Sequence, residues 1–470
     1  MENARRITDK FTTQDNIVTR VTRCGGKECT VLVQPDLSDA EAARAIVYSL
    51  VNYDGEISSL DDFSEKCVFE YDVTVSEDCD EATDDLLSGD IIVCLEGDER
   101  YAIVNARSYT TRGIVEPPTE TVMRGPREGF IEDLKTNLSL LERRIKSPDF
   151  AIDRLTVGRK TKTGVAVCYI SSVADKRVVK KLKKRLKKID IDGIVDSNYL
   201  VPYIEERPYS LFSQTGISEK PDIVAAKLLE GRVAILIDGS PMVVTVPFVL
   251  IEEFQSGEDY YQRSTYGTFI RLLRYFGLML ATLLPGLYIA LQNFHYTLIP
   301  VRFMITLVSA IKGLPLSPMA ETLFVLVLFE IIREASVRMP RAVGMAMSIV
   351  GALVLGETAV NAGLISSPAV MITALSSIAL FTVPNLIGPM SVLRLAYALV
   401  GGLFGLYGLI IAVMFSIHYV SALNGYGSPY LAPFAPLVFT DFKDAVERGV
   451  FPEMKKRPRS IPNTNETRQA

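Results

Sequence analysis

The sequence predicts an α/β soluble N-terminal region of two subdomains followed by an all-α polytopic membrane domain. Between positions 342 and 440 of the 470-residue chain only Glu357 and Arg394 are charged, too few for the surface of a water-soluble domain of that length. Residues 1–260 are instead rich in charge and alternate short β-type runs with amphipathic helical runs. Function is therefore to be sought in how the soluble and membrane regions affect each other.

Two stretches of the soluble region share a pattern that predicts two subdomains with related sheets. Residues 86–104 and 228–246 each contain a helix end, a glycine, a β-rich strand, a turn with a second glycine, and another β-rich strand. Chance similarity between two common helix–hairpin units is the alternative. The expected domains are 1–147 and 148–265 for the two subdomains, 266–425 for a helical region of four to five spans, and 426–470 for a partly disordered cytosolic tail.

Composition and motifs argue against enzyme activity, a metal centre and a cofactor. The net charge of −5 gives no sign of a nucleic-acid partner. The six cysteines lack the spacing of a zinc site, and the only two histidines, His295 and His418, lie in or beside apolar segments. Neither a phosphate-binding loop nor a nucleophile elbow is present in the sequence. Residues 1–10 are polar, without a signal peptide, so we expect the soluble region to stay in the cytosol.

A strongly basic helix is expected over residues 175–188. Its apolar residues recur at helical spacing and predict one buried face, while nine basic residues cover the rest. Contact with anionic lipid headgroups or an acidic partner is one interpretation of this charge. A solvated face balanced by acidic segments of the soluble region is the other.

The membrane half contains four clear apolar segments and one that is harder to place. The segment at residues 302–334 carries charges and prolines, so we expect it to cross only partly. Five full spans would separate the basic end of the tail from the soluble region, against the positive-inside tendency. The four clear segments are Tyr275–Val301, Ala342–Asn361, Ala369–Ile387 and Leu395–Tyr419.

Four charged residues are expected to be embedded in this apolar region. Charges within an apolar helix usually face the interior of a bundle or a water-filled cavity, because hydrocarbon does not solvate them. We therefore expect them to lie inside the helical region. They are Glu321, Glu330, Arg333 and Arg394.

A series of short motifs, in a fixed order across both halves of the chain, resembles one known family. The motifs are Glu116-Pro117-Pro118-Thr119-Glu120, Arg124-Gly125-Pro126, Gly129-Phe130-Ile131-Glu132-Asp133, Thr136-Asn137-Leu138, residues 231–241, Asp259-Tyr260-Tyr261-Gln262-Arg263, Arg333-Glu334-Ala335, Phe381-Thr382-Val383-Pro384 and Gly427-Ser428-Pro429-Tyr430. From about residue 30 to 440 the chain is similar to the A subunit of spore germination receptors, the GerA family.

This resemblance implies a protein integral to the spore inner membrane, acting with a transporter-like B subunit and a lipoprotein C subunit. The complex would sense nutrients such as amino acids, sugars or nucleosides and trigger ion release. The A subunit would be a homo-oligomer forming a cation channel, with the nutrient pocket mainly in the B subunit. Two alternatives stay open: an A-subunit-like protein of the dipicolinate-channel operon, and a secondary transporter, whose broken helices also carry embedded charges.

Three residues near the end of a span rich in glycine and alanine are candidates for a pore lining. Repeated around an oligomer axis, Glu357 would form a ring of carboxylates that favours cations, and Val360, with Asn361 beside it, would form an apolar gate that closes by dewetting. The alternative is that Glu357 ends a span and pairs with Arg394 or with lipid headgroups.

Two short motifs are candidates for coupling between the soluble and membrane regions. Arg124, Gly125 and Pro126 form a possible joint between subdomains, or else a tight turn. Tyr260, Tyr261 and Arg263 lie just ahead of the first span, where they would transmit force to a pore; otherwise they are part of a polar linker at the membrane edge.

Overall fold

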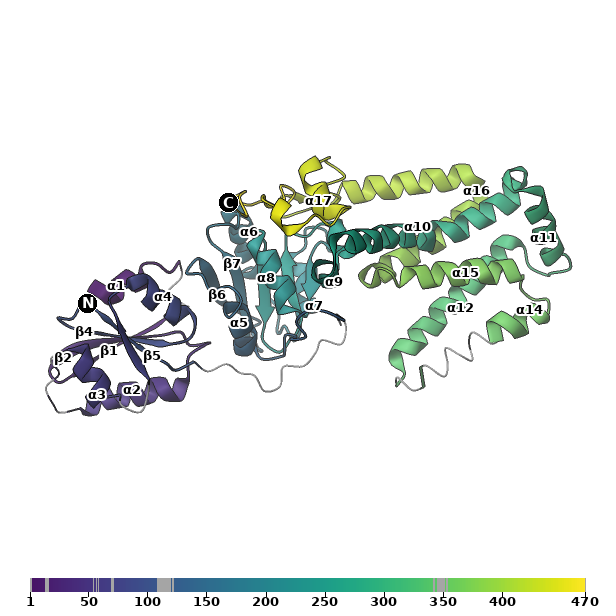
Figure 1. The fold of residues 1–470 in the computed structure, drawn as a ribbon. Coiled ribbons are helices and arrows are strands. Elements are labelled where there is room, and N and C mark those ends of the chain that lie inside the picture. The colour runs from purple at the N-terminus through teal and green to yellow at the C-terminus, as the bar shows by residue number, and fades with distance from the viewer. Residues whose placement is uncertain are drawn as a thin grey trace.

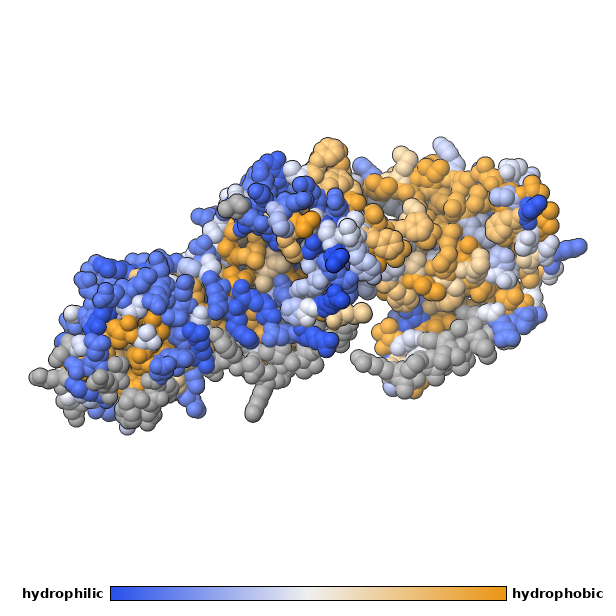
Figure 2. Space-filling view, viewed as in Figure 1, coloured by the Kyte–Doolittle hydropathy of each residue, from blue (hydrophilic) through white to orange (hydrophobic). Residues whose placement is uncertain are grey.

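The computed structural model describes residues 2–469 except 13–16, 54, 56, 58, 69–71, 108–119, 121, 341–342, 345–350 and 352–353. Figure 1 shows two sheet units, one after the other, followed by a helical region, with the C-terminal tail lying against the second sheet unit. In Figure 2 hydrophilic residues dominate the two sheet units and hydrophobic residues dominate the helical region.

The first sheet unit is a five-stranded antiparallel sheet with strand order β1-β2-β4-β5-β3. Its strands are β1 (Val18–Cys24), β2 (Lys27–Val33), β3 (Val73–Ser76), β4 (Ile91–Leu95) and β5 (Tyr101–Val104). Its helices are α1 (Glu2–Thr8), α2 (Ala40–Asn52), α3 (Leu60–Lys66) and α4 (Cys79–Leu87).

The second sheet unit is also a five-stranded antiparallel sheet, with order β6-β7-β9-β10-β8. Its strands are β6 (Phe150–Val157), β7 (Thr163–Ile170), β8 (Gly216–Ser218), β9 (Val233–Ile237) and β10 (Val243–Val246). Its helices are α5 (Leu134–Glu142), α6 (Lys176–Leu186), α7 (Ser197–Ile204) and α8 (Pro221–Leu229).

The two units have the same topology, strand for strand and helix for helix. The glycine that follows the helix before the β-hairpin has φ 101° in both units, at Gly89 after α4 and at Gly231 after α8. The hairpin glycines Gly97 and Gly239 have φ 84° and 87°. Positive φ favours glycine because it has no Cβ, so these positions fix the same helix end and the same turn in each unit. The prediction of two subdomains with related sheets is confirmed.

Each sheet is covered on both faces. In β4, Ile91 and Val93 pack into one core beneath α2 and α3, whereas Ile92 and Cys94 pack into another with α1 and α4. This alternation follows from the two-residue repeat of a strand, which sends successive side chains to opposite faces. The second unit repeats the arrangement, with α5 and α8 on one face and α6 and α7 on the other.

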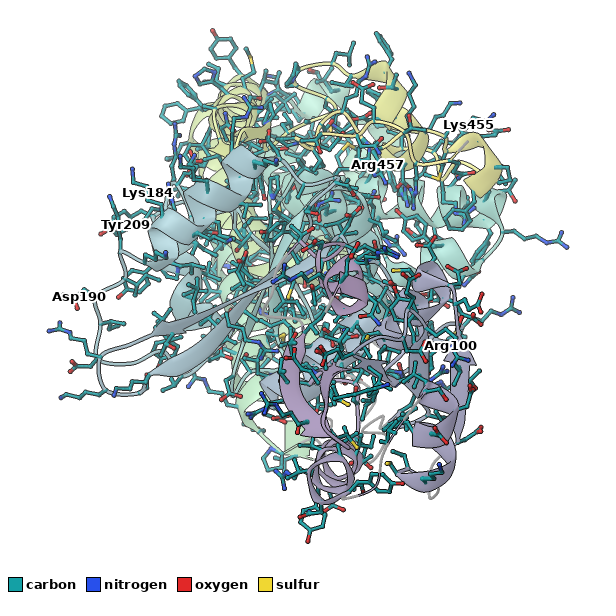
Figure 3. The ribbon with its side chains drawn as sticks, turned by 90° about the vertical axis from the view of Figure 1, so that its left-hand side faces the viewer. Arg100, Lys184, Asp190, Tyr209, Lys455 and Arg457 are labelled. Carbon is teal, nitrogen blue, oxygen red and sulfur yellow. The ribbon has the colours of Figure 1, made fainter. Side chains whose placement is uncertain are left out.

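The basic helix is confirmed as α6, which buries Val178, Val179, Leu182 and Leu186. Its basic residues are partly paired within the second unit: Lys181 with Glu206 and Lys183 with Asp153. Lys184 is exposed and points away from the unit in Figure 3. These ion pairs support the interpretation of a solvated face, and the exposed lysines leave contact with an anionic surface open.

The helical region begins after the short α9 (Gly257–Tyr261). Among the residues that the structure describes, two segments of this region are long and apolar enough to cross a membrane, Ser264–Phe294 and Pro384–Ser421. Its described helices are α10 (Ser264–Phe294), α11 (Val301–Ile311), α12 (Pro318–Arg338), α14 (Ala359–Asn361), α15 (Ser367–Leu380) and α16 (Ile387–Ser421), with a π-helical turn at Val354–Thr358. Most of the expected span Ala342–Asn361 lies outside the described residues.

Helix α16 reverses direction at Gly405. This glycine has φ 64° and ψ −156°, a conformation that a residue with a side chain rarely adopts. A Cβ on Gly408 would lie 3.2 Å from Cγ1 of Val400, which a straight helix would hold about 12 Å away along its axis. Met390 and Val420, near the two ends of α16, pack into the same core beside the second sheet unit. The expected single span Leu395–Tyr419 is therefore two helical segments, and the tail returns to the side of the soluble units (Figure 1).

The tail packs on the second sheet unit. The backbone N–H of Thr464 donates to the carbonyl of Val173 at 2.8 Å, and Asn463 forms a β-bridge with Ala174. The guanidinium of Arg457 donates to the carbonyl of Leu229 at 2.7 Å. These contacts place the end of the chain beside the helix–strand turn of the second unit.

Candidate functional site: the junction of the soluble and helical regions

The base of the first membrane helix is held by a buried carboxylate. Asp259 in α9 accepts from both terminal nitrogens of Arg274, at 2.7 and 2.9 Å, and lies 3.5 Å from Arg271. The exposed fractions of Asp259 and Arg271 are 4% and 0%. Ser256 caps α9, and Asp259 closes the capping box by accepting from the backbone N–H of Ser256. Two arginines one turn apart on α10 are thus fixed to the helix that precedes it.

The tail contributes the second half of this junction. Asp444 in α17 (Phe442–Ala445) accepts from the hydroxyl of Tyr260 at 2.9 Å with both carboxylate oxygens, and its backbone carbonyl accepts from Arg271. Burial raises the pKa of Asp444 to about 6. Arg448 donates to the carbonyl of Tyr260 at 3.0 Å and lies over its ring. Tyr260 is therefore enclosed by α9, α10 and the tail.

The structure brings the two coupling motifs together at one point. Gly125 has φ +120°, and a Cβ there would lie 2.5 Å from the ring of Tyr261. Any other residue here would be strained by the positive φ and would have to displace the ring of Tyr261, so this position favours glycine. The Tyr261 hydroxyl donates to Asp222 of α8. Arg124 is exposed beside this contact, and Pro126 is half-buried.

Arg263 takes a different place from Tyr260 and Tyr261. It is the N-cap residue of α10, with extended backbone angles and without a side-chain capping bond. Its position marks where the chain leaves α9 and enters the first membrane helix.

Three of the four expected embedded charges form one network in the helical region. Glu330 of α12 pairs with Arg394 of α16 at 2.6 Å and with Arg333 at 2.5 Å. Arg394 also donates to Ser376 and Ser377 of α15, at 3.2 and 3.1 Å. Buried charges are stable in an apolar region only when they are paired and hydrogen-bonded in this way. Glu321, in the first turn of α12, lies outside this network and accepts from Ser366, the N-cap residue of α15.

The pore-lining candidates follow the part of their span that the structure leaves undescribed. Glu357 and Asn361 are exposed and Val360 is half-buried. Arg394 pairs with Glu330 in this structure, and no ion pair between Arg394 and Glu357 is found among the described residues. The exposure of Glu357 and Asn361 leaves them accessible to lipid, water or another subunit.

A buried carboxyl also joins the two sheet units. Glu142 of α5 accepts from the amide of Gln34 at 3.0 Å, and beside it Arg154 pairs with Asp36. Burial, together with the negative charge of Asp36, raises the pKa of Glu142 to about 8. The contact between the two units therefore contains a carboxyl group that changes charge near neutral pH.

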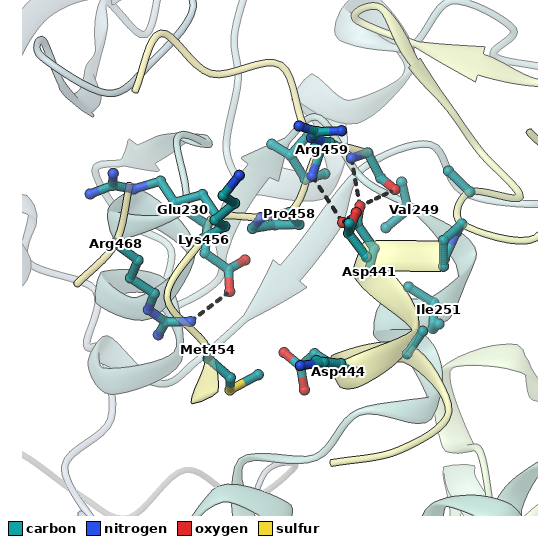
Figure 4. Close-up of a pocket in the computed structure, with 18 of the residues that line it drawn as sticks. Glu230, Val249, Ile251, Asp441, Asp444, Met454, Lys456, Pro458, Arg459 and Arg468 are labelled. Carbon is teal, nitrogen blue, oxygen red and sulfur yellow. Dashed lines mark hydrogen bonds and ion pairs between the residues drawn. The ribbon is translucent and has the colours of Figure 1, made fainter. Parts of the chain in front are cut away.

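A cavity of about 250 Å³ lies between the second sheet unit and the tail, directly beside the junction (Figure 4). Apolar residues such as Val249, Ile251 and Met454 form part of its wall. Asp441 closes one side by accepting from the backbone N–H groups of Arg459 and Ser460, at 3.1 and 2.7 Å. Asp444 of the junction also lines this cavity, so the cavity extends to the partner of Tyr260.

Sequence reasoning missed the contribution of the tail to the junction. Asp444 and Arg448 belong to a segment expected to be a partly disordered tail, and they lie 184 and 188 residues from Tyr260. The available signal was the apolar and aromatic character of residues 431–442, which is unusual for a solvated tail.

Comparison with known proteins identifies the family. A family model described as Bacillus/Clostridium GerA spore germination protein matches residues 5–460. Spore germination protein KA of Bacillus subtilis (strain 168) is 37% identical over 399 residues, covering 84% of this chain and 73% of that protein. Spore germination protein A1 of the same organism is 33% identical over 433 residues, covering 92% of this chain and 89% of that protein.

A solved structure also matches. The crystal structure of the N-terminal domain of the A subunit of the Bacillus megaterium spore germinant receptor GerK3 is 30% identical to this chain, with a TM-score of 0.41. The match covers 52% of this chain and 93% of that one.

The family match extends over both sheet units, the helical region and most of the tail. It confirms the resemblance seen in the sequence motifs, and it confirms that the chain is not an enzyme, because the members of this family are receptor subunits. The chain belongs to the GerA family of spore germination proteins, as a membrane-bound A subunit of a germinant receptor.

Proposed function

We propose that this A subunit forms a homo-oligomer and conducts cations when a nutrient is sensed, so that its opening triggers germination. A transporter-like B subunit and a lipoprotein C subunit would complete the receptor in the spore inner membrane. The relatives named above as spore germination proteins support the process. A secondary transporter is the alternative for the conducting role.

The single observation that carries this proposal is the junction around Tyr260. Asp259 and Arg271 are buried, and Arg271 contacts both Asp259 and the partly buried Asp444, so α9, the tail and the base of α10 move as one body. Separating such a group would leave a buried charge without a partner, at a cost of about 3–5 kcal/mol. A movement of the soluble units would therefore reach the first membrane helix with little loss. Gly125 extends this connection toward the link between the two units, through its contact with Tyr261.

The orientation follows from the reversal at Gly405. Because the tail contacts the second sheet unit, the soluble units and the tail lie on one side of the helical region. The tail carries the basic run 455–459, which favours the cytosolic side. We therefore place the N-terminal domain and the tail in the cytosol, with an even number of crossings between them.

The proposed pore is lined by the segment that ends at Asn361. Small residues let neighbouring helices approach closely around an axis. Glu357 would then supply a ring of carboxylates and Val360 an apolar constriction. Glu357 is exposed and Val360 is half-buried, so both side chains are accessible to neighbouring subunits in an oligomer.

The test is passive cation flux through vesicles reconstituted with the purified full chain. We expect Val360→Ala to increase the leak, because a smaller side chain widens and wets the constriction. We expect Glu357→Gln to reduce selectivity for cations over anions. Val392→Ala, at an exposed apolar position of α16, is the matched control and should leave the flux unchanged.

Three outcomes separate the candidates. A leak altered by the two pore variants and not by the control supports the channel. Flux that saturates and requires a co-substrate would favour the transporter. Absence of flux from a folded oligomer would assign conduction to a partner subunit and leave this chain a coupling scaffold.

A further inference from the structure

One buried carboxylate in the helical region stands apart from all the paired ones described above. Glu321, in the first turn of α12, has an exposed fraction of 0%. It accepts from the backbone N–H and the hydroxyl of Ser366, at 3.0 and 2.9 Å. Within the described part of the chain no lysine, arginine or histidine forms an ion pair with it, whereas Glu330 pairs with two arginines.

Beside this carboxylate, α10 presents polar groups without hydrogen bonds. Tyr288, Gln292 and His295 recur at four- and three-residue spacing and therefore share one face of the helix. The hydroxyl of Tyr288, both amide atoms of Gln292 and Nδ1 of His295 are buried and lack a hydrogen bond among the described residues. Tyr288 is 7% exposed; its hydroxyl has weak polar contacts with Ser366 and Gln292, longer than a hydrogen bond, and lies within range of the charge of Glu321.

The energetics of this arrangement are unfavourable without a further partner. The N-terminus of α15 offsets only about half a unit of the negative charge on Glu321. Each buried polar group left without a hydrogen bond destabilises the fold, and an unpaired charge in an apolar region does so more strongly. The groups therefore combine surplus negative charge with unused oxygen lone pairs from Tyr288 and Gln292.

We propose that Glu321, Tyr288 and Gln292 bind one monovalent metal cation inside each helical region. One carboxylate with a neutral hydroxyl and a neutral carbonyl supplies a single negative charge and hard oxygen ligands, which matches an alkali-metal ion. Divalent cations are usually held by several carboxylates, and this cluster has one. The bound ion connects α10, α12 and the start of α15, so it stabilises the helical region at this point whether or not the chain conducts ions.

The experiment measures thermal unfolding of the purified full chain in detergent. The unfolding midpoint is recorded against KCl and against NaCl, with N-methyl-D-glucamine chloride holding the ionic strength constant. We expect one of the two ions to raise the midpoint with saturation, because a ligand of the folded state stabilises it by mass action. We expect Gln292→Leu and Tyr288→Phe to raise the half-saturating concentration by about tenfold each, and Glu321→Gln to abolish the response.

A matched control lies on the same helix. Asn293 is exposed next to Gln292, so Asn293→Leu should keep the saturating response of the wild-type chain. Equal midpoints for the wild-type chain in all three salts would overturn the proposal. A full response in Glu321→Gln would do the same. Should that variant fail to fold, unchanged half-saturation in both Gln292→Leu and Tyr288→Phe would overturn it.

Discussion

Replacing Glu142 with glutamine should make the contact between the two sheet units insensitive to pH. In the wild-type chain this carboxyl is 2% exposed, and one of its oxygens is buried without a hydrogen bond among the described residues. Among the described residues its hydrogen-bond partner is the amide of Gln34, while the charge of Asp36 opposes ionisation. Glutamine keeps the shape of the protonated side chain and removes the titration.

The expected magnitude follows from the pKa of Glu142, which is about 8 in the folded chain against 4.5 for an unperturbed glutamate. Between these values the unfolded chain has lost this proton and the folded chain still holds it, so stability falls as pH rises. The contribution is fully present below pH 4.5 and is lost as pH rises through 8. At about 1.4 kcal/mol per pH unit, and allowing for the approach to the midpoint, the loss between pH 6 and 8 is about 2 kcal/mol.

Hydrogen–deuterium exchange read by mass spectrometry is the suitable assay, because it reports stability locally in the full chain. Asp444 and Glu253 also have raised pKa values, about 6 and 7, but both lie at the junction with the helical region and not at the contact between the two sheet units. We therefore follow the opening free energy of α5, corrected for the intrinsic effect of pH on exchange. The wild-type value should fall by about 2 kcal/mol from pH 6 to 8.

The variants define what would refute this reasoning. Glu142→Gln should show a flat profile over this range and should be more stable than the wild-type chain at pH 8. Glu132→Gln, at an exposed position two residues ahead of α5, should keep the wild-type slope. A wild-type profile that is flat between pH 6 and 8, or an equal slope in Glu142→Gln, would show that Glu142 is not the titrating group.

Two further predictions concern the helical region. Gly405→Ala should destabilise the fold by about 1–2 kcal/mol or more, because φ is 64° at this position, and should therefore lower the thermal unfolding midpoint of the full chain in detergent. The control is Gly388→Ala, because the space around the Cβ position of Gly388 is open. Equal midpoints for the two variants would contradict the reversal at Gly405. Glu330→Gln should cost about 3 kcal/mol or more, because it leaves Arg394 buried without its partner, whereas Glu334→Gln removes an exposed pair worth about 0.3–0.5 kcal/mol. Urea unfolding in detergent measures both, and a loss for Glu330→Gln no larger than that for Glu334→Gln would show that the buried pair is dispensable.

Local patterns predicted much of the soluble region. The glycines Gly89 and Gly231 marked equivalent helix ends because the residue that follows the last turn of each helix adopts positive φ, which favours glycine. The helical periodicity of residues 175–188 predicted α6 and its buried face. These features depend on residues within a few positions of one another, and the sequence displays such relations directly.

The site could be predicted only in part. The motif around Tyr260 was recognised, but its partners Asp444 and Arg448 come from the tail, nearly two hundred positions away along the chain. The charges Glu330, Arg333 and Arg394 were expected inside the bundle, yet which of them pair was open until α12 and α16 were placed side by side. Sequence spacing cannot show which of several buried charges meet.

The sequence by itself determined the division into a charged α/β region and an apolar helical region. The reason is that the amino-acid composition of a segment, and the spacing of its apolar residues, indicate whether it faces water or an apolar environment. It also determined that the two soluble subdomains are related. Only the tertiary structure decided that α16 turns back at Gly405, that the tail returns to the second sheet unit, and that Glu321 is buried without a charged partner among the described residues. These features depend on contacts between distant segments, whose free energies no local pattern records.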